Sequence, residues 1–144
     1  MFKTVLLAAL LATAASDAAP ISAGQWRVSD DLKVLMINGR RQTHFFPVSD
    51  PGATCLKSDQ AVKGPGLAFN DPELCRVLNS KIDGSNYEYT LECKVSESKD
   101  LTTTKVSGTF AKDSYTGKAV SIQRRGSTVI EMRSDVYAKR IGDC

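Results

Sequence analysis

The amino-acid sequence predicts an all-β domain, built as a strongly curved antiparallel meander or a small up-and-down barrel with one short helical segment. Apolar and polar residues alternate with a period of two along most of the chain, and turn signals separate the alternating stretches. No long amphipathic helical pattern occurs. A β-sandwich is the alternative fold, although its crossing connections need more long loops than this chain offers.

The first 18 residues have the layout of a secretory signal peptide. A short positive start is followed by an apolar run rich in Leu and Ala over residues 4–15 and then by small residues. The apolar run is too short to span a membrane, so we expect no transmembrane segment. We therefore assign 1–18 to the signal peptide and 19–144 to a single domain, exported to the periplasm or secreted.

A β-hairpin with a cysteine at each end is predicted over residues 75–93. Gly84 suits a left-handed position in a three-residue loop over 83–85, and Arg76 then lies opposite Glu92 as a cross-strand charge pair. The other predicted pairs are Ile82–Asn86, Lys81–Tyr87, Asn79–Tyr89, Val77–Leu91 and Cys75–Cys93.

The four cysteines of the chain indicate two disulfides. An even cysteine count in an exported chain is typical of disulfide bonding in an oxidising compartment, and four cysteines allow three connectivities. The hairpin register favours Cys75–Cys93, which leaves Cys55–Cys144. We expect no zinc site, because no CxxC motif occurs and the only histidine, His44, has no thiol nearby.

A long strand is predicted from Gly24 onward, with Asp30 interrupting its apolar side through a bend or bulge. Asn38-Gly39 predicts a type I′ hairpin turn, with a return strand over 40–48. That register places Phe45 opposite Leu32 on the inward side and His44 on the polar side.

Further strands are predicted over 101–112, 118–124 and 128–141, with a turn at 113–117. A three-residue loop at 125–127 pairs apolar with apolar residues. The resulting pairs are Ile122–Ile130 and Val120–Met132. The connection over 49–74 breaks the alternation and is long enough to suggest a role. It is interpreted either as a flap over one end of the sheet or as a lid over a ligand.

The charge distribution argues against nucleic-acid binding. The formal net charge is only +3, and the arginine doublets 40–41 and 124–125 do not form a coherent basic face. No nucleophile motif such as GxSxG occurs. We therefore expect no enzyme, no catalytic residues and no cofactor.

The inward-facing apolar residues suggest a site for a small hydrophobic or envelope-derived ligand. The candidate ligand-binding residues are Trp26, Val34, Met36, Phe45, Phe110 and Met132. The alternative is an inhibitor or accessory module that binds an envelope protein through its surface, with the two arginine doublets as contacts.

The opening Gly24-Gln25-Trp26 resembles the GxW signature of lipocalins, in which the tryptophan packs against an arginine of the closing strand. Arg140 or Arg133 would be that arginine here. The whole order of GxW, Cys55-Leu56, two isolated cysteines and a terminal Gly142-Asp143-Cys144 resembles a family of exported bacterial proteins known only as a domain of unknown function. This resemblance implies a periplasmic, disulfide-bonded small β domain and carries over no catalytic residue.

Overall fold

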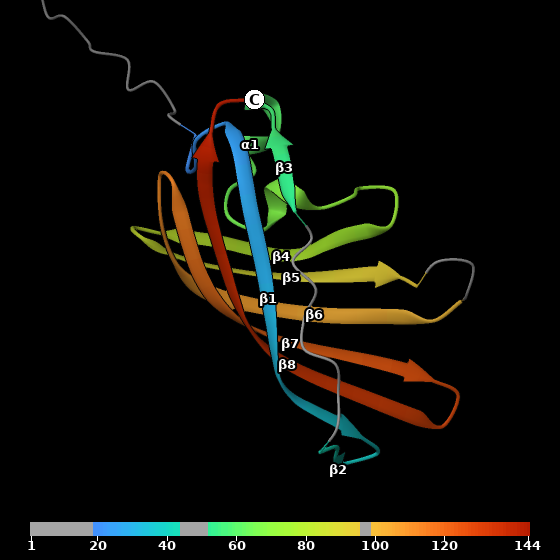
Figure 1. The fold of residues 1–144 in the computed structure, drawn as a ribbon. Coiled ribbons are helices and arrows are strands. Elements are labelled where there is room, and N and C mark those ends of the chain that lie inside the picture. The colour runs from blue at the N-terminus through green and yellow to red at the C-terminus, as the bar shows by residue number, and fades with distance from the viewer. Residues whose placement is uncertain (1–18, 44–51, 96–98) are drawn as a thin grey trace, which may run out of the picture.

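A computed structural model describes residues 19–43, 52–95 and 99–144 (Figure 1). The predicted signal peptide over 1–18 lies outside these residues. Within the described residues, two short helices, α1 (Ser58–Ala61) and a 3₁₀ turn (Leu67–Phe69), accompany eight strands. The strands are β1 (Gly24–Ile37), β2 (Arg40–Arg41), β3 (Ala53–Leu56), β4 (Cys75–Asp83), β5 (Asn86–Lys94), β6 (Leu101–Ala111), β7 (Ser114–Arg125) and β8 (Thr128–Gly142). None of the described helices is long and apolar enough to span a membrane.

The eight strands form one antiparallel sheet, which confirms the predicted meander. The strand order is β2-β1-β8-β7-β6-β5-β4, and β3 pairs with β1 as well (Figure 1). The sheet does not close into a barrel, because β3 and β4 are not paired with each other. The chain between them, residues 57–74, folds into α1, the 3₁₀ turn and loops instead of a closing strand. Of the two predicted forms, the structure is therefore the curved meander and not the barrel, and the single sheet excludes the sandwich.

The sheet is strongly curved, with one concave and one convex face. The carboxylate of Asp30 on β1 acts electrostatically on Tyr89 on β5, four strand positions away in the sheet. In a flat sheet those positions would be about 19 Å apart. Figure 1 shows how the sheet bends so that β1 crosses in front of the strands β4–β7.

The strand register orders the side chains of the concave face into six rows. From the Trp26 end, the rows are Trp26–Arg140; Val28–Ala138–Tyr115–Phe110; Asp30–Val136–Gly117–Gly108–Tyr87–Ile82; Leu32–Ser134–Ala119–Val106–Tyr89–Ser80; Leu35–Met132–Ser121–Thr104–Leu91–Val77; and Ile37–Ile130–Gln123–Thr102–Cys93–Cys75.

An aromatic core fills the Trp26 end of the concave face. Trp26 is fully buried, and its indole Nε1–H donates to the Ser22 carbonyl at 2.9 Å. The Trp26 ring lies 6.0 Å from the Tyr115 ring and 6.1 Å from the Phe69 ring, both within the usual range for aromatic pairs. Residues 56–69, here called the plug, bury Leu56, Ala61 and Ala68 against this core. The predicted flap over one end of the sheet is thus confirmed.

A pair of glycines makes room for Tyr87. Gly108 and Gly117 lie opposite each other on β6 and β7, next to Tyr87 in the same row. The Tyr87 hydroxyl donates to the Thr116 carbonyl at 3.1 Å. A Cβ on Gly117 would lie 2.5 Å from the Tyr87 Oη, and a Cβ on Gly108 would overlap the Thr116 carbonyl. Because glycine has no side chain, the Tyr87 ring can lie against the backbone of β6 and β7 at these two positions.

The β4–β5 hairpin confirms the predicted pairs at its cysteine end and corrects those at its turn. Arg76 lies opposite Glu92, with their side chains 2.7 Å apart, and Val77 lies opposite Leu91. The turn has two residues, Gly84 and Ser85, so the predicted three-residue loop is wrong. The pairs near the turn are Asp83–Asn86, Ile82–Tyr87, Lys81–Glu88, Ser80–Tyr89 and Asn79–Thr90. A bulge between Val77 and Asn79 absorbs the difference of one residue.

A second bulge corrects the predicted face of Val34 and Met36. The register between β1 and β8 shifts between Leu32 and Val34, so Lys33 is an extra residue. An extra residue exchanges the two faces of a strand. Val34 and Met36 consequently lie on the convex face, and their place on the concave face is taken by Leu35 and Ile37. The bend expected at Asp30 is thus located three residues later.

The loop of the β7–β8 hairpin is one residue shorter than predicted. Gly126 has a φ of +58°, and Arg125 pairs with Thr128 across a two-residue loop. Ile122 therefore lies opposite Glu131 and Val120 opposite Arg133, so the predicted apolar pairs are wrong. The turn predicted over 113–117 is also too long, because β7 already begins at Ser114.

The first hairpin turn is as predicted. Asn38 and Gly39 both have positive φ, 49° and 76°, as a type I′ turn requires. Its return strand β2 contains only Arg40 and Arg41. The part of the predicted return strand that contains His44 and Phe45 falls within residues 44–51, which the structure does not describe.

Both disulfides have the predicted connectivity. Cys75–Cys93 joins β4 to β5. Cys55–Cys144 joins β3 to Cys144, which lies two residues after the end of β8. The two bridges span sequence separations of 18 and 89 residues, respectively.

We predict that removing Cys55–Cys144 destabilises the protein more than removing Cys75–Cys93. Closing a longer loop removes more entropy from the unfolded chain, about 4 to 5 kcal/mol against about 3 kcal/mol. The paired Cys→Ser variants should differ accordingly in urea unfolding. Equal losses of stability would contradict the argument.

We predict that Gly108→Ala lowers the free energy of unfolding by about 1–3 kcal/mol, because the added methyl group collides with backbone of β7. Gly142→Ala is the matched control, since a Cβ there has no neighbour within 4 Å. The control should change stability by less than about 0.5 kcal/mol. Urea titrations measure both variants, and equal effects would refute the proposed contact.

Candidate functional site

The concave face has a filled end and an open half. The plug and the aromatic core occupy the rows nearest Trp26, whereas no described segment packs over the fifth and sixth rows. Most side chains of these two rows are half-buried, and Val77 and Ile37 are 47% and 36% exposed. The open half is thus a surface with apolar side chains that the described chain leaves accessible.

The open half has two apolar walls and a polar floor. One wall combines Leu35, Ile37, Ile130 and Met132 of β1 and β8. The opposite wall combines Val77, Leu91 and the Cys75–Cys93 disulfide of β4 and β5. Between them, the floor consists of Thr102, Thr104, Ser121 and Gln123, and the hydroxyls of Thr104 and Ser121 lie 2.8 Å apart. Such a surface suits a molecule that is largely apolar and also has a few polar groups.

Asp30 lies in the third row, and the fourth row separates it from the open half. Its strand position is opposite Val136, which packs against the core, and the next inward residue along β1 is Leu32. The side chain is exposed. Neither a hydrogen bond nor an ion pair from a described residue reaches it, whereas the neighbouring Asp31 pairs with Lys33.

Burial keeps the three core tyrosines protonated. Desolvation raises the pKa of Tyr89 to about 12, and the negative charge of Asp30 adds to this shift. Desolvation also raises the pKa values of Tyr87 and Tyr115 well above their ordinary value of 10. A backbone hydrogen bond from Gly66 acts in the opposite direction on Tyr115. The hydroxyls are therefore neutral hydrogen-bonding groups near pH 7 and not phenolate bases.

The predicted ligand-binding residues lie in three different environments. Trp26 and Phe110 belong to the filled core, and Met132 belongs to a wall of the open half. Val34 and Met36 lie on the convex face, and Phe45 lies outside the described residues. Three further wall residues were not among the predicted ligand-binding residues: Leu35, Ile37 and Leu91. A bulge shifts the first two onto this face, and the alternation of the sequence contains no sign of it.

Arg140 is the arginine next to Trp26. The two residues lie directly opposite each other on β8 and β1, and Arg140 Nε donates to the Ala23 carbonyl at 2.7 Å. A Cβ on Gly24 would lie 2.5 Å from that nitrogen, which explains the glycine of the GxW motif. Arg133, the other candidate, lies opposite Val34, several residues from Trp26 along the sheet.

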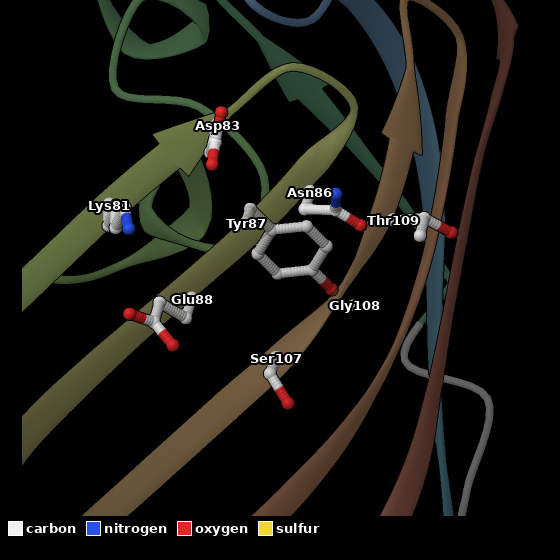
Figure 2. Close-up of a pocket in the computed structure, with 8 residues that line it drawn as sticks. All are labelled: Lys81, Asp83, Asn86, Tyr87, Glu88, Ser107, Gly108 and Thr109. Carbon is white, nitrogen blue, oxygen red and sulfur yellow. The ribbon is translucent and has the colours of Figure 1, made fainter.

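A hollow lies on the convex face, over β4, β5 and β6 (Figure 2). It has a volume of about 410 Å³ and is lined mostly by polar residues. The lining residues are Lys81, Asp83, Asn86, Tyr87, Glu88, Ser107, Gly108 and Thr109. A neighbouring hollow of about 420 Å³ shares residues 107–109 and continues to the exposed Tyr137.

Ion pairs on the convex face are solvent-exposed. Lys118 and Asp135 lie 2.9 Å apart, and their hydrogen bond raises the pKa of Lys118 and lowers that of Asp135. Exposed pairs of this kind contribute little to stability. At the hairpin ends, Arg125 contacts Asp100 at 3.1 Å, whereas the side chains of Arg40 and Arg41 are exposed.

Within residues 19–43, 52–95 and 99–144, no group of three His, Cys, Asp or Glu side chains is placed to hold a metal ion. All four cysteines are in disulfides. The thiolate chemistry of metal binding is therefore not available to these cysteines while they are oxidised.

These features define a small, disulfide-linked, open antiparallel β domain whose concave face is filled at one end. The chain belongs to the family described as "Protein of unknown function (DUF3617)", whose model matches residues 21–144. The resemblance in the sequence to a family of unknown function is thereby confirmed. No curated protein and no solved structure matches the chain.

We predict that the protein loses stability as the pH rises from about 10 to 12, with Tyr89 contributing. The folded state retains the Tyr89 proton, and the unfolded chain releases it above a pKa of about 10. The stabilisation is therefore complete below pH 10. Tyr89→Phe should make the decline shallower, by at most about 1.4 kcal/mol per pH unit. Urea titrations between pH 8 and 11 test this, and parallel curves would contradict it.

Proposed function

We propose that this protein is an exported binding protein that holds a small hydrophobic or amphiphilic molecule on the open half of its concave face. The observation that carries the proposal is the pair of accessible apolar walls on either side of a hydroxyl-lined floor. A soluble domain usually buries the apolar side of its sheet, and accessible apolar surface of this kind often marks a binding site.

The disulfides support export as the setting of this function. Disulfides form and persist in oxidising compartments such as the periplasm, and both bridges here connect structural elements of the sheet. The signal-peptide pattern of residues 1–18 points to the same compartment. A molecule of the cell envelope is accordingly the ligand that we propose.

The fold supplies a rigid support for such a ligand. The plug and the aromatic core fix the strands at the Trp26 end, and the Cys75–Cys93 bridge fixes β4 against β5 within one wall. Binding on a preformed surface avoids the entropy loss of ordering the protein. The role that we propose is accordingly binding.

We predict that Met132→Trp lowers affinity for an apolar probe at least about tenfold, because the larger side chain fills the space next to the β1–β8 wall. Met36→Trp is the matched control, since Met36 lies on the convex face. Titration with the fluorescent probe N-phenyl-1-naphthylamine measures both. Equal affinities of the two variants and the unchanged protein would refute the site.

Native mass spectrometry of protein purified gently from its own compartment identifies the ligand class. A reproducible adduct that Met132→Trp removes and Met36→Trp retains would support the proposal. A bare protein ion together with no probe binding would refute it and favour a surface-binding accessory module, for which the hollow of Figure 2 and the neighbouring convex hollow are the candidate contact region.

A further inference from the structure

The concave face contains one charged side chain that no other part of the described chain neutralises. In rows two to six, Asp30 is the single residue with a charge at pH 7, since the tyrosines remain protonated. The other acidic residues nearby have partners on the convex face: Asp31 pairs with Lys33, and Asp135 with Lys118. Among the described residues of rows two to six, Asp30 is therefore the exposed acidic residue without a cation.

The surroundings of Asp30 combine an aromatic ring with apolar side chains. Tyr89 lies on the opposite side of the curved sheet, and the negative charge of Asp30 contributes to raising its pKa. The Tyr89 ring stacks on the Tyr87 ring, with centroids 6.1 Å apart. A carboxylate and aromatic rings are together the groups that attract ammonium ions, one by charge and the other by cation–π interaction.

The apolar wall of β1 begins immediately after Asp30. Leu32, Leu35 and Ile37 follow on the concave side, and the extended strand from Asp30 to Ile37 is about 23 Å long. A ligand with its charged end at Asp30 would thus extend an apolar chain along this wall toward the rim of the sheet.

We propose that the open half of the concave face binds a cationic amphiphile, with its ammonium group at Asp30 and its apolar chain along the β1–β8 wall. This inference rests on the proposed function, since it names the chemical class of the ligand for the same surface. The ammonium group has charge complementarity to Asp30, the one charged residue in the described rows two to six, and the chain matches the wall.

The test compares three probes of equal chain length below their micelle concentrations: dodecyltrimethylammonium, a neutral dodecyl glycol ether and dodecanoate. Calorimetric titration should show dodecyltrimethylammonium binding about tenfold more tightly than the neutral probe. Asp30→Asn should abolish this preference and leave the affinity for the neutral probe unchanged. Asp31→Asn, which removes a neighbouring charge from the convex side, is the matched control and should retain the preference.

The outcomes separate the two proposals. Binding of all three probes with equal affinity, unaffected by Asp30→Asn, would overturn the role of Asp30 and leave the apolar site standing, as would tighter binding of dodecanoate. No binding of any probe would overturn both. Because Asp30 is exposed and unpaired, Asp30→Asn should unfold at the same urea concentration as the unchanged protein, which excludes misfolding as the cause of a lost preference.

Discussion

The packing of Trp26 between the sheet and the plug is the contact on which the rest of the structure depends. Its ring joins β1 to Tyr115 of β7 and to Phe69 of the plug, so that it connects both layers of the core. The sheet is open between β3 and β4, and without this contact its concave face would lack a core at either end. One large aromatic residue thus replaces, at one end, the closure that a barrel obtains from a final strand pair.

The division of the concave face follows from that arrangement. The plug covers the rows near Trp26, and the connection that contains it, residues 57–74, also has to lead from β3 to the start of β4. The remaining rows keep apolar walls, and no described segment buries them. Asp30 lies in a row that also contains core residues, but its own side chain is exposed, which explains how a carboxylate is tolerated on the inward side of a strand.

The sequence predicts the strands, the meander, the Asn38-Gly39 turn and both disulfides, because these depend on local alternation and on turn residues. It does not predict the faces of Val34 and Met36 or the pairs of Ile122, because these depend on single-residue insertions. A bulge at Lys33 or Leu78 changes no local preference, yet it exchanges the two sides of a strand. Trp26, Phe110 and Met132 were assigned to the correct face, since Trp26 precedes the Lys33 bulge and the β6–β7 and β7–β8 registers have no shift. The residues of the open half were therefore only partly predictable from the sequence: Met132 was predicted to face inward, and Leu35 was not.

The pairing of β1 with β8 has a consequence for how the chain folds after synthesis. The first long strand has its most extensive pairing with the last one, about 100 residues further along the chain. Pairings between such distant residues form slowly, because a large loop must close before any contact is gained. Until β8 arrives, β1 has an unpaired edge that is open to aggregation or proteolysis. The newly made chain thus passes through a vulnerable stage in which chaperones of its compartment would be needed most.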